Sequence, residues 1–195
     1  MAIVKAPLFS LAASGQLAKS LVYLNWKGIK DVRQHVIPAN PKTTAQQSQR
    51  SKLTGAVSRW HTYEFSAMDT TAIAQLASVQ AKPMSGFNAV CKLDINAQVA
   101  GNAFQLVTSL ATSVVSASGF TVAASGRTAG TYKIRYGTSP VVMTSTGDVD
   151  NNAGALSSRL ANLSAGVKYY FQIYADDEGH DDVSGIGTQT TDTEK

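Results

Sequence analysis

The sequence is poor in cysteine and in long apolar runs. Cys91 is the only cysteine among 195 residues, so no disulfide can form within the chain and its stability does not need an oxidising compartment. No apolar stretch approaches the roughly 18–20 residues that a membrane-spanning helix needs. We therefore expect no membrane insertion. Hydrophobic residues make up 44% of the chain, which is enough for a buried core and does not indicate wholesale disorder.

Acidic residues are scarce in the N-terminal half. Residues 1–100 hold eleven Lys and Arg against four Asp and Glu, whereas residues 101–195 hold six against nine. Asp31 is the only acid within residues 1–62. A basic half joined to an acidic half indicates two modules with different neighbours. We place the boundary near Gly101, with a basic anchoring module over residues 1–100 and a second module over residues 101–195.

The N-terminal half predicts an α+β module, formed by a β-hairpin and about three helices. β-Forming residues at 21–26 and 29–37 flank a turn at Lys27 and Gly28. Thr43 or Thr44, each with a Gln three residues later, starts a helix that runs to Trp60. Its expected apolar face consists of Leu53, Ala56, Val57 and Trp60. A second helix is expected after Asp69 as its cap, and a third near Ser85.

The apolar period changes to two in the C-terminal half. Turn residues separate the alternating runs, and no strong helix pattern intervenes, which predicts an all-β sandwich. Outward positions on the last of these strands fall to Tyr170, Gln172 and Tyr174. The runs themselves are Phe120, Val122 and Ala124; Tyr132, Ile134 and Tyr136; Val141 to Met143; and Tyr169, Phe171, Ile173 and Ala175.

One stretch of this half is more specific. Leu163, Gly166 and Tyr169 follow one another at spacings of three, and alternating apolar positions come next. This pattern resembles the corner before strand F of fibronectin type III domains, which are immunoglobulin-like sandwiches. The resemblance covers about eighty residues and implies that the Tyr169 hydroxyl reaches back to a backbone group. The chain lacks the family's strand-B Trp and has no Arg-Gly-Asp, so integrin-type recognition is not implied.

The N-terminal half carries a second pattern, Asn-Pro-x-Thr-x-x-Gln-x-x-x-Arg, over residues 40–50. Together with the preceding hairpin, it resembles a small family of proteins from tailed-phage and prophage structural regions, and the match covers roughly residues 13–90. The resemblance implies association with a virion and carries no known chemistry. From the residues alone, Asn40 and Pro41 form a turn, and Gln46 and Arg50 lie one helical turn apart, where they can bond carbonyls or a partner chain.

Candidate catalytic groups are sparse. The three histidines lie far apart in the sequence, no nucleophile signature accompanies them, and we expect neither an enzyme nor a cofactor. Asp148, Asp150 and Asn152 have the alternating oxygen ligands of a calcium loop. However, Gly154 is one place late for that motif, and Arg159 stands where it needs Glu. We favour a solvated loop there and in the acidic run at 176–182, with weak Ca²⁺ binding as the alternative.

The leading hypothesis is a non-enzymatic virion structural protein of a tailed bacteriophage, made in the host cytoplasm. It would be a capsid decoration, neck or tail component in multiple symmetric copies, with other virion proteins as partners. The N-terminal module would anchor it and the sandwich would project. Buried aromatics and Arg dominate interface energies, so we expect the anchoring interface at Trp26, Lys27, Arg33, Gln46, Arg50 and Trp60.

Two alternatives stay open at the level of sequence. A surface- or carbohydrate-binding module would use the outward Tyr170 and Tyr174 together with the loop at 176–182. A packaging protein would bind nucleic acid through the basic N-terminal residues, with Tyr23 and Trp26 stacking on bases. No recognisable nucleic-acid fold motif accompanies those basic residues, so nucleic acid is the less favoured partner.

Overall fold

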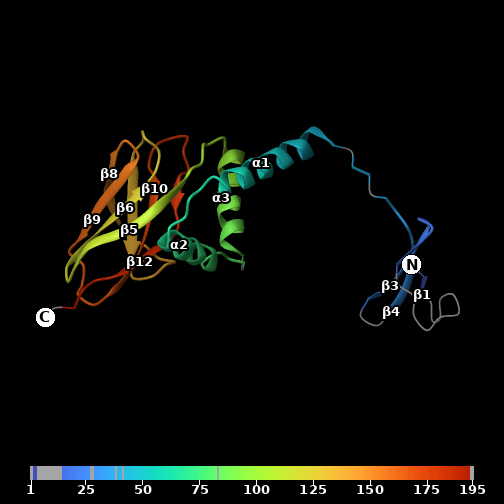
Figure 1. Ribbon diagram of the computed structural model, residues 1–195, viewed down its shortest axis with the longest axis horizontal. Coiled ribbons are helices and arrows are strands. Elements are labelled where there is room, and N and C mark those ends of the chain that lie inside the picture. The colour runs from blue at the N-terminus through green and yellow to red at the C-terminus, as the bar shows by residue number, and fades with distance from the viewer. Residues whose placement is uncertain are drawn as a thin grey trace. The chain divides into compact units, whose positions relative to one another are not determined.

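The computed structural model describes residues 2–3, 15–26, 29–37, 39–40, 42–82 and 84–193, and the chain divides into two compact units (Figure 1). Unit 1 is Met1–Thr43 and unit 2 is Thr44–Lys195. The division therefore falls at Thr43, whereas the sequence predicts a boundary near Gly101. The difference arises because the third helix packs on the first and second, and the second helix packs on the strands that follow.

Unit 1 contains a four-stranded antiparallel sheet in the order β1-β4-β3-β2. Its strands are β1 (Ala2–Ile3), β2 (Gly15–Leu17), β3 (Leu21–Trp26) and β4 (Ile29–Gln34). Trp26 pairs with Ile29, which confirms the predicted hairpin, while its turn at residues 27–28 lies outside the described residues. The second strand of this hairpin, β4, is shorter than the predicted 29–37. It ends at Gln34, and the following Val36 and Ile37 are exposed.

Three helices open unit 2: α1 (Thr44–Trp60), α2 (Ala67–Ser78) and α3 (Gly86–Ala100). All three were predicted, but α1 buries only Ala56, and Leu53 of its expected apolar face is 49% exposed. The cap of α2 differs from the expected Asp69. The helix begins after Ser66, whose hydroxyl accepts a hydrogen bond from the Asp69 N–H at 3.1 Å. No helix in the described part of the chain has the length and apolar character of a membrane crossing.

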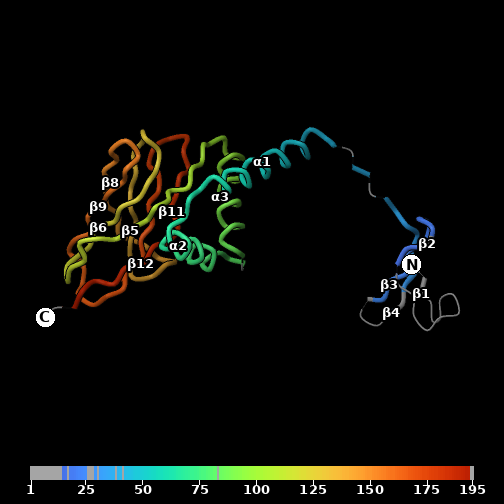
Figure 2. The backbone as a smooth tube through the Cα atoms, viewed as in Figure 1, coloured from blue at the N-terminus to red at the C-terminus, as the bar shows by residue number. Residues whose placement is uncertain are grey.

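Eight strands follow the helices (Figure 2). β8 pairs with β7 through its first half and with β9 through its second, so one strand belongs to both layers of the sandwich. β11 pairs with β5 and also with β10, and this joins the two layers at the other side. The strands are β5 (Leu106–Ser116), β6 (Gly119–Ser125), β7 (Tyr132–Gly137), β8 (Ser145–Asn152), β9 (Ala155–Ala161), β10 (Lys168–Ala175), β11 (Val183–Ser184) and β12 (Gly187–Thr190).

Three of the predicted runs are strands, and one is not. β6, β7 and β10 hold the alternating apolar residues as expected, with Phe120, Ile134 and Phe171 each at 0% exposure. The run at 141–143 is an exposed loop, so that prediction is wrong. β8 and β9 went unpredicted because β8 buries only Val149, while the buried positions of β9 include the polar Ser158.

Helix α2 is joined to the sandwich by a buried carboxylate. Asp69 is 2% exposed, and it accepts hydrogen bonds from the N–H groups of Ser66 at 2.9 Å, Ser109 at 2.8 Å and Leu110 at 2.9 Å. The first bond closes a capping box at the start of α2, and the other two satisfy N–H groups of β5 at a bulge where Ser109 has a φ of 56°. One side chain thus caps the start of a helix and accepts hydrogen bonds from a strand.

A second contact holds the same helix against the segment between β11 and β12 (Figure 1). The Ile186 N–H donates to the Ala72 carbonyl at 2.9 Å, and the side chain of Ala72 belongs to the sandwich core. A Cβ on Gly185 would lie 2.5 Å from the Ala72 carbonyl carbon, so only glycine permits this approach. Helix α2 therefore contributes to the sandwich core, while a second cluster, with Ile73, Val90 and Leu106, joins the helices to β5.

We predict that Asp69→Ala lowers the free energy of unfolding by about 3 kcal/mol, because it leaves the buried Leu110 N–H without an acceptor and removes the capping box of α2. Urea denaturation followed by circular dichroism measures the change. Asp192→Ala, at an exposed position, is the matched control and should change stability by less than about 0.5 kcal/mol. Equal small effects of the two substitutions would contradict the assigned role of Asp69.

Candidate functional site

The residues expected to anchor the protein lie in both units. Trp26 is on β3 and Arg33 on β4 in unit 1, whereas the remaining described ones are on α1 in unit 2. Lys27 lies outside the described residues. Arg33 is exposed, and so are Gln46 and Arg50 on α1. The structure therefore does not place all six residues in one unit.

Trp60 takes part in an aromatic cluster between the helices. Its ring centroid lies 4.7 Å from that of Phe65 and 5.4 Å from that of Phe87, the second pair meeting edge to face. Tyr63 joins the cluster, and its hydroxyl accepts a hydrogen bond from the Leu106 N–H at 3.1 Å. These contacts stabilise unit 2 from within. The Trp60 ring therefore packs inside unit 2, whereas the sequence predicts that it lies at the anchoring interface.

The corner before β10 has the geometry that the fibronectin type III resemblance implies. The Tyr169 hydroxyl accepts a hydrogen bond from the Ser164 N–H at 3.0 Å. Gly166 has a φ of 65°, in the left-handed region, and Leu163 packs against the core. The tyrosine thus fixes the chain where it crosses between the layers.

The sequence predicts a solvated loop at 176–182. The structure shows that part of this acidic loop is buried and hydrogen-bonded. Asp182 is 2% exposed, and it accepts hydrogen bonds from the Gln105 N–H at 2.7 Å, the Arg127 Nε at 2.6 Å and the Tyr132 hydroxyl at 2.9 Å. The Tyr132 hydroxyl in turn accepts from the Arg127 N–H at 3.0 Å. This network connects the loop before β7 to the loop after β10. Its members are remote in sequence, and no local signal reveals it.

Arg127 is the centre of charge in this network. Its Nη2 donates to both carboxylate oxygens of Asp177, at 3.1 and 2.9 Å. Burial lowers the pKa of Arg127, but the hydrogen bonds to Asp182 and Asp177 outweigh burial and raise the pKa above its usual value. The hydrogen bond from Arg127 lowers the pKa of Asp177 below 3.8. The arrangement is an ion-pair network that holds two loops together.

The calcium-ligand candidates form no loop. Asp148, Asp150 and Asn152 lie on β8, where alternate residues share a face, and all three are exposed. The expected loop is therefore a strand, followed by a tight turn in which Ala153 and Gly154 both have positive φ. Among the described residues no group of three His, Cys, Asp or Glu side chains could hold a metal ion. Cys91 is buried, and burial raises the pKa of its thiol, which disfavours the reactive thiolate.

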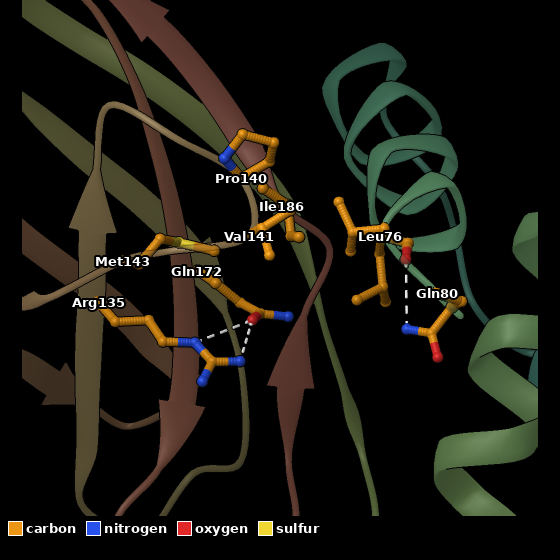
Figure 3. Close-up of a pocket in the computed structure, with 9 residues that line it drawn as sticks. Leu76, Gln80, Arg135, Pro140, Val141, Met143, Gln172 and Ile186 are labelled. Atoms are coloured by element: carbon orange, nitrogen blue, oxygen red, sulfur yellow. Dashed lines mark hydrogen bonds between the residues drawn. The ribbon is translucent and has the colours of Figure 1, made fainter.

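A groove of about 260 Å³ lies between the end of α2 and the outer face of β7 and β10 (Figure 3). Leu76 and Gln80 form the helical wall, and the loop after β7 contributes Pro140 and Val141 opposite. Gln172, predicted to face outward into solvent, is 1% exposed because the helix and the chain around Ser184 cover it. The groove exists because α2 packs beside the sandwich.

Arg135 projects along the floor of this groove toward Gln172 (Figure 3). Its Nε and Nη2 donate to the Gln172 Oε1 at 3.1 and 2.5 Å. The Gln172 Nε2 donates to the Ser184 carbonyl at 2.7 Å, which fixes the orientation of the amide. A buried neutral amide thus holds a charged guanidinium in place. The sequence places Arg135 on an outward face but gives no sign of this pairing.

The outward tyrosines of β10 each have a cation over the ring. Lys168 Nζ lies 5.3 Å from the centroid of Tyr170, and the Arg135 guanidinium carbon lies 5.7 Å from that of Tyr174. Both tyrosines are half-buried. The cations cover part of the ring surface on which a sugar would stack.

No protein-family model matches this sequence, and no curated protein matches it. Among solved structures, the C-terminal half matches fibronectin type III domains. The chicken CNTN1 FN1–FN3 domains match with 20% identity and a TM-score of 0.39 over 46% of this chain, and the match spans 33% of that chain. A fibronectin type III domain of human contactin 1 matches with 20% identity and a TM-score of 0.39, covering 46% of this chain and 78% of that one.

A third match is a fibronectin type III domain of human collagen XX, at 24% identity and a TM-score of 0.38, over 46% of this chain and 94% of that one. These likenesses concern the fold of the C-terminal half alone.

We predict that Arg127→Gln raises the pKa of Asp177 toward 3.8, because the substitution removes the guanidinium that favours the charged carboxylate. Since the folded pKa lies below the unfolded one, this ion pair stabilises the protein above about pH 4, and its contribution is lost as the pH falls through the folded pKa. Carboxyl-detected NMR titration measures the shift.

Arg159→Gln is the control for this titration, because the described partners of Arg159 are the Val114 carbonyl and nearby hydroxyls. It should leave the Asp177 titration unchanged. A titration that is the same in wild type and in Arg127→Gln would show that the pair does not set the charge of Asp177.

Proposed function

We propose that this chain is a non-enzymatic structural protein of a tailed-phage virion. Unit 1 attaches it to other virion proteins, and the fibronectin type III-like unit projects from the particle. The observation that carries the proposal is the exposure of the apolar side chains that are described in unit 1. Of its residues with described side chains, only Asp31 is buried, and the apolar ones are half-buried or exposed.

A sheet of this size is favoured by contact with another surface. Small domains bury a low fraction of their apolar area, and near about 40 residues a metal, disulfides or association often supplies the missing stability. Unit 1 spans 43 residues, and its described strands leave Ile29 51% exposed. Contact with a partner protein would cover these apolar groups, and this supports an attachment role.

The charge of unit 1 indicates the kind of partner. Residues 1–43 include six Lys and Arg and a single acid, Asp31. Arg33 is exposed on β4, and Lys19 is exposed beside the start of β3. Such a surface is complementary to an acidic protein face, and opposite charges give such an interface its specificity and rate of association. Several copies would repeat the contact around a symmetric particle.

The resemblance of residues 13–90 to proteins of tailed-phage structural regions supports the same proposal. Its motif spans the end of unit 1 and the start of α1, so it joins the attaching part to the projecting part.

We predict that the chain copurifies with particles at a fixed stoichiometry, and that Arg33→Glu lowers its incorporation by at least about tenfold. Charge reversal at an interface converts attraction into repulsion, and 1.4 kcal/mol corresponds to a factor of ten. Quantitative mass spectrometry of gradient-purified particles measures the incorporation.

Lys168→Glu, an exposed charge reversal in the sandwich, is the matched control and should be incorporated normally. The proposal is wrong if purified particles lack the chain. Loss of incorporation with Lys168→Glu but not with Arg33→Glu would instead place the attachment in unit 2.

A further inference from the structure

The groove between α2 and the outer face of β7 and β10 contains an arginine whose charge is not neutralised. Arg59 donates to Asp94, and Arg127 donates to Asp177 and Asp182. Arg135 has no ion pair among the described residues, and its hydrogen bonds go to the neutral amide of Gln172. The residues described as lining the groove include no Asp or Glu.

The surroundings hold Arg135 in a defined position. Gln172 is fully enclosed, and its amide is fixed by the Ser184 carbonyl. Ser184 is fixed in turn, because its hydroxyl accepts from the Ile173 N–H at 3.0 Å and donates to the Gly185 carbonyl at 2.7 Å. The guanidinium therefore loses little conformational freedom when it binds a ligand, and within the described part of the chain no hydrogen bond uses its Nη1.

Six of the nine residues that line the groove are apolar, although polar atoms provide more of its exposed lining. Leu76 and Val79 come from the end of α2, and Pro140, Val141 and Met143 come from the loop after β7. Ile186, from the segment between β11 and β12, lies beside Val141 and across the groove from Leu76 (Figure 3). On the loop after β7, Val141 is 72% exposed and its neighbour Val142 is 59% exposed, so two adjacent apolar side chains are in contact with water. A second cation stands at the helical end, where Lys92 Nζ donates to the Gln80 Oε1 at 2.9 Å.

We propose that this groove binds an extended segment of a partner protein, with an Asp or Glu side chain on Arg135 and an adjacent aliphatic side chain between Leu76 and Val141. A guanidinium pairs with a carboxylate through two parallel hydrogen bonds, and the exposed valines gain from contact with an aliphatic group. The volume of about 260 Å³ is below the usual range for organic cofactors and fits a short stretch of side chains. A free inorganic anion would need no aliphatic walls.

This site is distinct from the attachment surface of unit 1, and it rests on the proposed function only in taking the partner to be a protein. The two ideas can fail separately. Particles that contain the chain while the groove binds no peptide would overturn only the groove. A groove that binds peptide in a chain missing from particles would overturn only the virion role.

The test is an NMR titration of the full ¹⁵N-labelled chain with two matched peptides, acetyl-Val-Glu-Leu-Glu-Val-amide and acetyl-Val-Gln-Leu-Gln-Val-amide. The Glu peptide should shift the amide signals of groove residues, with a Kd at least about tenfold lower than that of the Gln peptide. Arg135→Gln should abolish the difference between the peptides. Arg159→Gln, which removes an arginine held only by backbone and hydroxyl oxygens, should preserve it.

Three outcomes would overturn the proposal. The peptides could bind equally, the shifts could map away from α2 and the 138–144 loop, or sodium acetate could give the same shifts at the same affinity, which would indicate a small-anion site. Because the peptide comparison is made on the wild-type chain, the test holds even if a variant folds poorly. The Arg135 side chain is exposed, so we expect Arg135→Gln to give a dispersed, folded spectrum.

Discussion

The buried carboxylate of Asp69 is the interaction on which the arrangement of unit 2 depends. A carboxylate removed from water is costly unless strong donors surround it, and here three backbone N–H groups from two elements provide them. Because the donors belong to the start of α2 and to a bulge of β5, the helix cannot shift along the strand without leaving a buried charge unsatisfied. The register between helix and sandwich is therefore fixed.

This fixed register has consequences elsewhere in the unit. It brings Ala72 against Gly185 and makes the helix a lateral wall of the sandwich. The wall covers Gln172, which then uses both ends of its amide inside the protein. Gln172 in turn orients Arg135. The groove therefore depends on a helix cap that lies about forty residues before the β5 residues that it bonds. The groove is thus a product of the docked helix, and a sandwich without α2 would not have it.

Much of this fold follows from local sequence pattern, and the exceptions have physical causes. The hairpin, three helices and the strands β6, β7 and β10 are visible because apolar residues alternate or recur at helical spacing. β8 is not predicted because the sequence signal of a strand is a series of buried apolar residues, and β8 has a single buried residue. The sequence predicts that Asp69 lies at the start of a helix, where the structure places it in the first turn after the cap Ser66. The sequence does not predict the bonds of Asp69 to β5, because that strand is forty residues away in the sequence. The Arg135–Gln172 pair and the Asp182 network depend on cross-strand and loop contacts that no single segment encodes.

The strand shared by both layers affects how copies of the protein pack when many lie close together. β8 joins the layers at one side and β11 joins them at the other, so the strands β5 to β11 form a continuous hydrogen-bonded circuit. Exposed strand edges are the usual starting points for uncontrolled pairing between neighbouring chains. A sandwich with few such edges can be packed side by side in many copies, and neighbouring sandwiches then meet through side chains without fusing their sheets.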